Sequence, residues 1–346
     1  IALDDYYAGA NYDFFQHGTG TAGSGTLDPY AGESYNYGAQ NYLQRPDTRY
    51  SGGFFAHYDA SSMFKFYSSF MFTDDHTVEV AAPSAVFLGV GTVSGAFQQI
   101  NCTNPLMTQQ ENQQLCGLLP GDNMNTDPAV TAALGHSYYD GAGNITPGQS
   151  LLEIGRRNIE GGNRVTELTS ASYRGQIGMK GEISDNWTYD IYAQFGTSRY
   201  EETLLNEMSK ARVQQALEVD PLTGACYSEE SNPPSSVGCV PMDIFNGIGS
   251  LTPAMEAFVG ATGLQHGYTQ EQIVSGSITG DLGEWGGKSP WAKDPIGVSF
   301  GAEYRDEELE LLTDSEYQLN YLYWAGVASL PQPLAGFHVA EGFMEF

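Results

Sequence analysis

Four cysteines are the residues whose spacing most directly predicts chemistry. Cys102 and Cys116 enclose one short loop, Cys226 and Cys239 enclose another, and no odd cysteine is left over. Zinc sites prefer cysteines separated by about two to four residues, whereas evenly paired local cysteines are typical of disulfides in an oxidising compartment. The spacing therefore favours the disulfides Cys102–Cys116 and Cys226–Cys239, with a four-cysteine zinc site as the alternative.

A second chemically suggestive cluster consists of Arg156, Arg157 and Glu160. Adjacent residues of a strand face opposite sides, so one arginine could reach the inside of the molecule and bind an anionic or hydroxylated ligand. The alternative is an ion pair that braces the fold. Both interpretations also apply to further charged residues that alternation places on an inward face: Arg174, Lys180, Glu303 and Arg305.

Other catalytic and ligand-binding patterns are missing from the sequence. There is no P-loop, no G-x-S-x-G and no H-E-x-x-H, and the six histidines occur singly. The run Gly121-Asp122-Asn123 lacks the ligand spacing of a known calcium loop. We therefore predict no catalytic residue, no metal site and no bound cofactor, and a protein that is not an enzyme.

The composition excludes one large class of partners. The chain of 346 residues has 42 acidic and 14 basic side chains, a formal net charge of −28, which disfavours binding to nucleic acid. Many of its acidic residues lie in segments that we expect to be loops. They are either ordinary solvated charges or, alternatively, the lining of an entrance that attracts cations. The sequence contains no run of 18 apolar residues, so it does not predict a transmembrane helix. The chain opens directly in a strand-like stretch without a signal peptide, which is expected of a processed chain or a fragment.

The elements that must position these residues are best seen in the stretch from Arg164 to Asn206. On both sides of Ser184-Asp185-Asn186, apolar and polar residues alternate with a period of two. This alternation gives each arm one apolar and one polar face, and the turn residues between the arms predict a β-hairpin.

The length of these arms indicates the class of fold. Strands in soluble domains usually have about 3–10 residues, whereas arms of roughly 20 residues extend about 65 Å. A strand of a membrane barrel needs only about 10 tilted residues to cross a bilayer. The pattern therefore favours an all-β, antiparallel, up-and-down transmembrane barrel over a large soluble sandwich.

The rest of the chain repeats this plan. We expect about eight long strands, joined alternately by short turns and long loops that carry short helices, as in outer-membrane barrels. Three helices are expected, at Thr108–Leu115 with a Thr108/Glu111 capping box, after Ser209, and after Thr252-Pro253. The expected strands include residues 2–14, 48–60, 63–81, 271–285, 295–312 and 337–346.

Several longer motifs are more specific than this alternation. They are RPDTRYSGGFFAHYD (45–59), RRNIEGGNR (156–164), the hairpin YRGQIGMKGEISDNWTYDIYAQFG (173–196), CVPMDIFNGIGSLTPAM (239–255) and TGDLGEW..KSPWA...IGVSFGAEYRDEELEL (279–311). As a set and in this order, they resemble the barrel of TonB-dependent outer-membrane receptors. The resemblance implies that residues 1–346 are a single partial domain, an internal part of a barrel of about 22 strands. A complete eight-stranded barrel is the alternative.

The resemblance also implies a function. Receptors of this family import a scarce nutrient, and a TonB-type energising protein acts on them through an N-terminal plug region that this sequence lacks. The expected partners are outer-membrane lipid and a small-molecule or oligosaccharide substrate, such as an iron chelate, a cofactor or a sugar. A passive porin-like channel and a secreted sugar-binding β protein are the alternatives.

Overall fold

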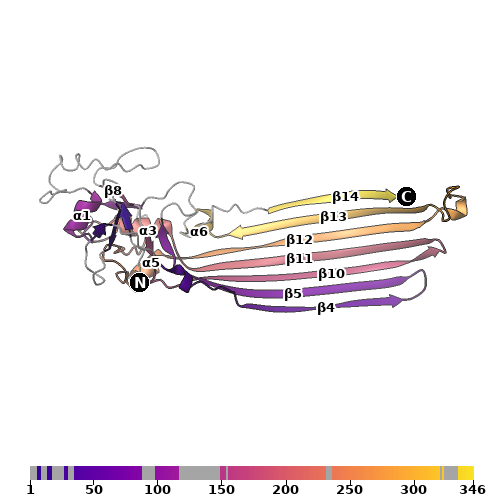
Figure 1. Ribbon diagram of the computed structural model, residues 1–346, viewed down its shortest axis with the longest axis horizontal. Coiled ribbons are helices and arrows are strands. Elements are labelled where there is room, and N and C mark those ends of the chain that lie inside the picture. The colour runs from indigo at the N-terminus through magenta and orange to yellow at the C-terminus, as the bar shows by residue number, and fades with distance from the viewer. Residues whose placement is uncertain are drawn as a thin grey trace.

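The structure is a computed structural model of the chain. It describes residues 6–8, 14–17, 27–29, 35–87, 98–116, 149–152, 155–230, 236–319, 322 and 334–346. Within these residues, a long sheet extends from a compact head of short elements (Figure 1).

The long sheet has seven strands in the order β14-β13-β12-β11-β10-β5-β4, and every neighbouring pair is antiparallel. Among these seven long strands, neighbours in the sheet also follow one another along the chain, as in an up-and-down meander. The strands are β4 (Asp47–Asp59), β5 (Lys65–Ala81), β10 (Arg164–Ser184), β11 (Trp187–Met208), β12 (Gly260–Asp281), β13 (Gly297–Thr313) and β14 (Leu334–Glu345).

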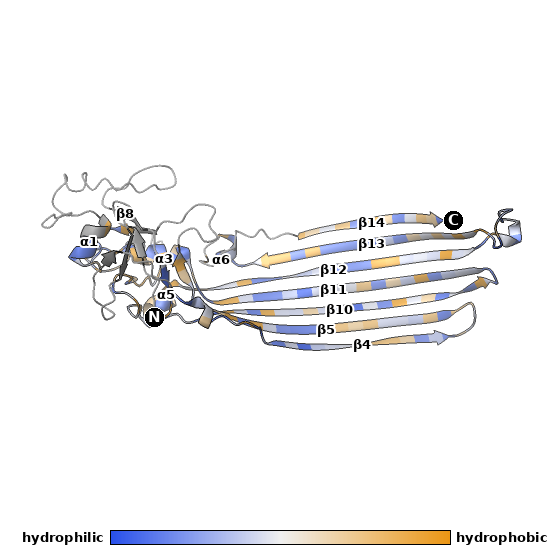
Figure 2. Ribbon diagram, viewed as in Figure 1, coloured by the Kyte–Doolittle hydropathy of each residue, from blue (hydrophilic) through white to orange (hydrophobic). Residues whose placement is uncertain are grey.

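The predicted central hairpin is confirmed. β10 has 21 residues and β11 has 22. The two strands pair in register from Val165–Leu205 to Glu182–Thr188, and the register shifts before the last pair, Ser184–Trp187. Along the long strands, hydrophobic and hydrophilic residues alternate (Figure 2). The expected antiparallel all-β architecture is therefore present, with strands much longer than those of a usual soluble sheet.

The head is formed by the described residues of the two long connections, 82–163 and 209–259. It contains the helices α1 (Gln109–Cys116), α3 (Lys210–Leu217), α4 (Tyr227–Glu230) and α5 (Pro253–Val259), and the short strands β6 (Ala85–Phe87), β7 (Gln98–Asn101), β8 (Gln149–Leu152) and β9 (Gly155–Arg157). The strands pair as β6 with β9 and β7 with β8. Three short elements lie elsewhere in the chain: η1 (Tyr37–Ala39), η2 (Gly283–Trp285) and α6 (Ser315–Gln318).

The sequence signals for the helix starts are mostly confirmed. Thr108 and Glu111 form the predicted capping box, because the Thr108 N–H donates to Glu111 Oε2 over 2.6 Å and the Glu111 N–H donates to Thr108 Oγ1 over 3.3 Å. The Thr252 side chain accepts the Met255 N–H at the start of α5. Ser209 occupies the N-cap of α3, but its side chain makes no capping hydrogen bond.

The main apolar core lies in the head, whereas the sheet consists of a single layer (Figure 1). Fourteen buried residues pack together in this core. They are Val86, Ile100, Leu115, Met208, Val213, Ala216, Leu217, Cys226, Cys239, Met242, Ile244, Phe245, Leu251 and Val259. The head therefore holds together as a packed unit, although it is built from connections.

One predicted strand is wrong. Residues 2–14 were expected to form a long arm of the barrel, but β1 (Tyr6–Ala8) and β2 (Phe14–His17) instead pair with each other, and β2 pairs with β3 (Leu27–Pro29). Aromatic alternation predicts an extended chain, but it does not specify the pairing partner. The long sheet therefore has seven described strands rather than about eight, and β4 and β14 are its two edges.

Candidate functional site

One face of the long sheet is continuously apolar. Side chains that pair in register across the strands lie next to one another on the same face. One row contains Ala56, Ser68, Ile177, Ala193, Val274, Tyr304 and Ala340, and the next contains Tyr58, Phe66, Met179, Ile191, Gly276, Ala302 and Gly342. Ile177, near the middle, is 67% exposed, so no described element covers this face there.

This apolar surface, which we call the apolar band, has a defined height. Along β5 it extends from Phe64, which directly precedes the strand, to Phe72. This distance is about 26 Å at about 3.3 Å per residue. Aromatic pairs mark its limit on the side of the head, with ring centroids 6.0 Å apart for Phe54–Phe70 and 6.1 Å apart for Tyr173–Phe195.

The same face becomes acidic closer to the head. β13 continues there with Asp306, Glu308 and Glu310, which follow Tyr304 at alternate positions. The Tyr268 hydroxyl donates to Glu308 Oε1 over 2.9 Å. The strands continue without interruption, and only the side chains on this face change from apolar to charged. This change sets the edge of the apolar band on the side of the head.

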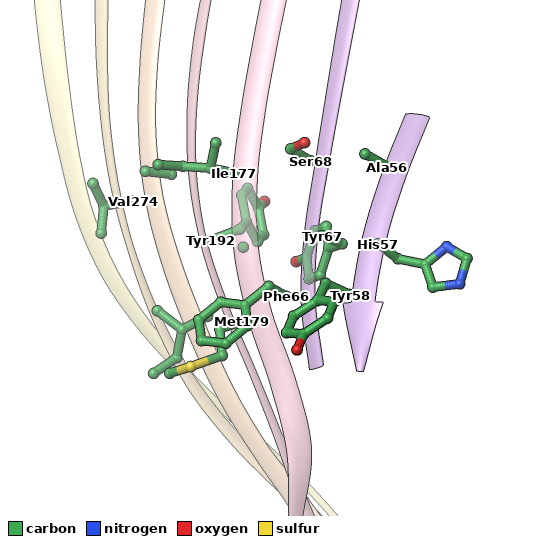
Figure 3. Close-up of a pocket in the computed structure, with 13 residues that line it drawn as sticks. Ala56, His57, Tyr58, Phe66, Tyr67, Ser68, Ile177, Met179, Tyr192 and Val274 are labelled. Atoms are coloured by element: carbon green, nitrogen blue, oxygen red, sulfur yellow. The ribbon is translucent and has the colours of Figure 1, made fainter. Parts of the chain in front are cut away.

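The middle of the apolar band is shallowly hollowed. An open depression of about 600 Å³ has Ile177, Met179, Ile191 and Val274 among its lining residues. Figure 3 shows the bulky Phe66 and Met179 at one end of this depression and the small Ala56 and Ser68 at the other. Its lining is mainly apolar, although His57, Tyr58 and Ser68 also belong to it.

The opposite face is polar, and it contains all four of the charged residues that alternation predicted to face inward: Arg174, Lys180, Glu303 and Arg305. Arg174 Nε donates to Gln194 Oε1 over 2.7 Å, and Gln194 Nε2 donates to Glu271 Oε1 over 2.6 Å. Arg174 and Glu271 line an open depression of about 370 Å³ together with hydroxyl groups and Glu307. Arg305 Nε lies 3.7 Å from Glu307 Oε1.

Glu303 lies two positions from Arg305 on this face. It stands opposite Glu341 in register, a like-charge arrangement that opposes pairing. The structure therefore gives Arg174 an amide partner and Arg305 an acidic one, whereas Glu303 faces another carboxylate.

Closer to the hairpin turns, the side chain of Tyr67 extends from β5 over β10 to β11. The Tyr67 hydroxyl donates to Asp190 Oδ1 over 2.6 Å, and Lys180 Nζ lies 5.6 Å from the Tyr67 ring centroid. β10 separates Tyr67 from Asp190 in the sheet, and the ring passes over Gly178, where a Cβ atom would overlap it. A small residue on the central strand thus permits a contact between strands that are not adjacent.

A buried ion pair lies where the sheet meets the head. Arg164 Nη1 is 3.7 Å from Glu207 Oε1, the Ser84 hydroxyl donates to Glu207 Oε2 over 2.7 Å, and Arg164 Nε donates to the Ala82 carbonyl over 2.7 Å. Burial raises the pKa of Glu207, although Ser84 and Arg164 both favour its charged form. Sequence reasoning missed this cluster, because its members are far apart in the chain.

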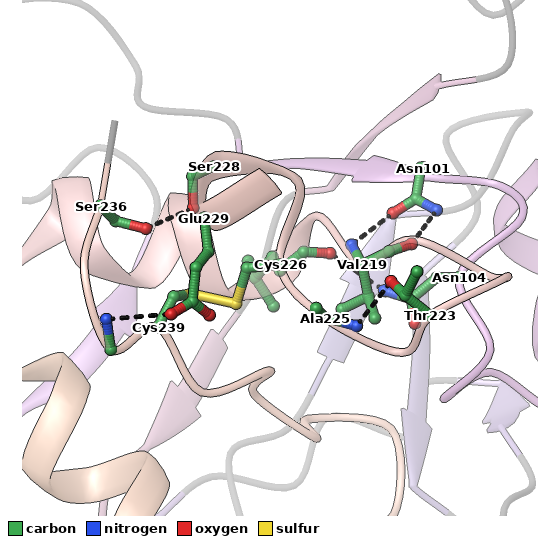
Figure 4. Close-up of a disulfide and its surroundings, with 12 residues drawn as sticks. Asn101, Asn104, Val219, Thr223, Ala225, Cys226, Ser228, Glu229, Ser236 and Cys239 are labelled. Carbon is green, nitrogen blue, oxygen red and sulfur yellow. Dashed lines mark hydrogen bonds between the residues drawn. A yellow bond between two sulfur atoms is a disulfide. The ribbon is translucent and has the colours of Figure 1, made fainter. Parts of the chain in front are cut away.

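A disulfide closes a loop within the second connection, and hydrogen bonds join the two connections. The predicted disulfide Cys226–Cys239 is confirmed. Beside it, Asn101 of the first connection accepts the Val219 N–H over 3.0 Å and donates to the Val219 carbonyl over 2.7 Å (Figure 4). Cys102 is also disulfide-bonded, but the side chain of Cys116 lies outside the described residues, so the pairing Cys102–Cys116 stays a prediction.

Arg156 and Arg157 lie in the head rather than along a long strand. Arg156 is 1% exposed, and its Nη2 donates to Glu160 Oε1 over 2.6 Å and to the Gly247 carbonyl over 3.3 Å. Arg157 Nη1 donates to the Pro83 carbonyl over 3.1 Å, and its guanidinium lies 5.7 Å from the Tyr35 ring centroid. Both arginines thus connect separate parts of the head, and in this structure Arg156 has no access to a ligand.

No group of three or more His, Cys, Asp or Glu side chains is placed to hold a metal ion in the described part of the chain. No described helix is both long and apolar enough to cross a membrane.

Comparison with known proteins identifies no relative. No family model matches the sequence, no curated protein matches it, and no solved structure matches the fold.

Proposed function

We propose that this chain forms part of the wall of an outer-membrane β-barrel receptor, with the apolar band in contact with lipid. The observation that carries the proposal is the band itself. It is a face of exposed apolar side chains about 26 Å high, and outer-membrane barrels have an apolar belt of about 25 Å between aromatic girdles. In water such a face would require a second layer, and none of the described elements provides one.

The opposite face fits the inside of such a wall. Arg174, Gln194 and Glu271 satisfy one another while remaining accessible, as expected of side chains around a water-filled lumen. The head would then lie on the outer side, where long loops are typical and where a disulfide such as Cys226–Cys239 persists.

The receptor assignment depends on the sequence resemblance. It implies TonB-energised uptake of an iron chelate, a cofactor or an oligosaccharide, with the head capturing the solute. In that mechanism the wall performs no bond chemistry. A passive channel differs in one measurable respect, since solute uptake through it would continue after the energy supply of the inner membrane is collapsed.

The decisive experiment locates the apolar band relative to lipid. Spin labels are attached at Ile177→Cys and, as a matched control, at Gln176→Cys in the lipid-reconstituted protein with its disulfides intact. We expect the label at position 177 to collide mainly with oxygen dissolved in lipid and the label at position 176 mainly with an aqueous nickel chelate. Equal exposure of both labels to the aqueous reagent would reject the membrane wall and favour a secreted β protein.

A further inference from the structure

The connection between β12 and β13, residues 282–296, is a folded turn at the end of the sheet away from the head (Figure 1). The Leu282 N–H donates to the Ile296 carbonyl over 2.9 Å. The Ile296 N–H donates to the Gly287 carbonyl, and the Gly287 N–H donates to the Leu282 carbonyl, each over 2.8 Å. Gly286 has a φ of 72°, a conformation that favours glycine. The backbone therefore fixes the positions from which the side chains of this turn project.

Two tryptophans project from this turn into the surroundings. Trp285 is 70% exposed and Trp291 is 93% exposed. The Trp285 ring lies 5.6 Å from that of Trp187, and Trp187 shares its face of β11 with Tyr189 and Ile191. The exposed indoles therefore extend the apolar band beyond the last residues of the strands.

The turn also differs in charge from the rest of the chain. It contains Lys288 and Lys293, two of only five lysines in a chain of net charge −28. Both lysines are exposed, and neither forms an ion pair with an acidic side chain among the described residues. Glu284 and Asp294 lie in the same turn, so its two basic and two acidic residues leave it formally neutral.

This combination fits the polar boundary of a bilayer. Indole is a large apolar ring with one N–H donor, and it is enriched where lipid meets water. A lysine can keep its methylene groups in apolar surroundings while its ammonium group reaches phosphate. A soluble partner would explain the exposed rings, but it would not explain their continuity with the apolar band.

We infer that the turn 282–296 binds the phospholipid headgroup layer at the hairpin end of the sheet. Trp285 and Trp291 lie at the boundary between headgroups and acyl chains, and Lys288 and Lys293 contact lipid phosphates. The inference rests on the proposed function, and it adds a specific anchor that fixes how deeply the wall sits in the membrane.

The first test measures the depth of Trp291. Trp187, Trp285 and Trp324 are replaced by Phe, and the protein is reconstituted with phospholipids brominated either near the headgroup or near the chain end. We expect the shallow bromine to quench Trp291 at least twofold more than the deep bromine. If the triple variant does not fold, the same quantity follows from the difference between the wild type and Trp291→Phe.

The second test addresses the lysines. Electron spin resonance compares how strongly a spin-labelled anionic phospholipid and its zwitterionic counterpart associate with the protein. We expect a preference for the anionic lipid that is lost in the Lys288→Gln/Lys293→Gln double variant. Lys180→Gln, on the polar face, should retain the preference. An unchanged preference in the double variant would overturn the role of the lysines.

The outcomes separate this inference from the proposed function. If the label at position 177 is in lipid but Trp291 is quenched only by aqueous acrylamide, the anchor is wrong and the wall stands. If the label at position 177 is itself in water, the proposed function fails, and the anchor fails with it.

Discussion

Arg156 illustrates what single residues contribute to the head. A guanidinium that is 1% exposed is tolerated only when charge and hydrogen bonds replace the lost water. Glu160 supplies the charge, and it also accepts the Gly249 N–H over 2.6 Å. One carboxylate therefore joins the segment after β9 to the loop before α5, so its removal should affect two connections together.

We predict that Glu160→Gln destabilises the head by about 3 kcal/mol, because it removes the carboxylate that pairs with a buried guanidinium. Burial alone would raise the pKa of Glu160, but Arg156 outweighs this effect and the pKa is lowered. The stabilisation is therefore fully present above the ordinary Glu pKa of about 4.3, and it is lost as the pH falls through the lowered value. Urea unfolding at several pH values should show the difference between wild type and variant shrinking in acid.

The matched control for this prediction is Glu182→Gln. Glu182 is exposed and lies 3.5 Å from Lys65 Nζ, so its loss should cost less than about 1 kcal/mol. Equal effects of the two substitutions at neutral pH would contradict the assignment of Glu160 as a buried counter-ion.

A second residue-scale prediction concerns Gly178. A Cβ atom there would overlap the Tyr67 ring, whereas at Gly196, also on the polar face, it would meet only the Tyr173 carbonyl oxygen at 4.0 Å. We expect Gly178→Ala to cost about 1–3 kcal/mol by overpacking and to break the Tyr67–Asp190 hydrogen bond. Gly196→Ala should be nearly neutral. Thermal unfolding of the two variants checks this, and a larger loss at Gly196 would refute it.

At the scale of elements, the hairpins are the part of the fold that local sequence specifies. Alternation over β10 and β11, with turn residues between them, determines both strands and their register, because a slip by one residue would invert every side chain. The capping box of α1 is equally local. Such features need only residues that are neighbours in the sequence, and the structure confirms them.

The features that sequence reasoning missed depend on distant pairing. Arg156 and Arg157 lie in a three-residue strand whose partner is β6, so alternation could not show that Arg156 would be enclosed. Residues 2–14 have a strand-like pattern, yet β1 and β2 join another sheet. The Arg164–Glu207–Ser84 cluster likewise combines three separate segments.

The faces of the strands give an element-scale prediction. Arg placed at Ile177 would lie near the middle of the apolar band, and at the centre of a bilayer it should cost about 2–4 kcal/mol. Gln176→Arg, one residue away on the polar face, should cost far less. Folding yield and unfolding free energy in lipid vesicles measure both, and the reverse order would invert the assignment of the faces.

At the scale of the whole molecule, the number of strands limits how the wall can close. In a seven-stranded antiparallel meander, the first and last strands point in the same direction. Closing this sheet on itself would place β4 beside β14 in parallel, so an all-antiparallel barrel needs an odd number of strands beyond these seven. Two copies inserted in the same orientation and joined edge to edge would also meet in parallel. The sheet therefore fits one section of a larger barrel better than a complete small one.

The separation of the two edges tests this argument. Ala56 on β4 and Ala340 on β14 lie in one row across the seven strands. Six strand spacings of about 4.8 Å place them about 29 Å apart on a flat sheet, and slightly closer on the gently curved wall of a large barrel. Spin labels at Ala56→Cys and Ala340→Cys, with the native disulfides intact, should therefore give a distance of about 25–30 Å by pulsed electron resonance in lipid. A self-closed sheet would bring the two edges to adjacent positions, on the order of 5 Å apart between their backbones. A distance distribution below about 15 Å would thus establish closure within one chain, while the longer distance would leave both edges open to antiparallel strands.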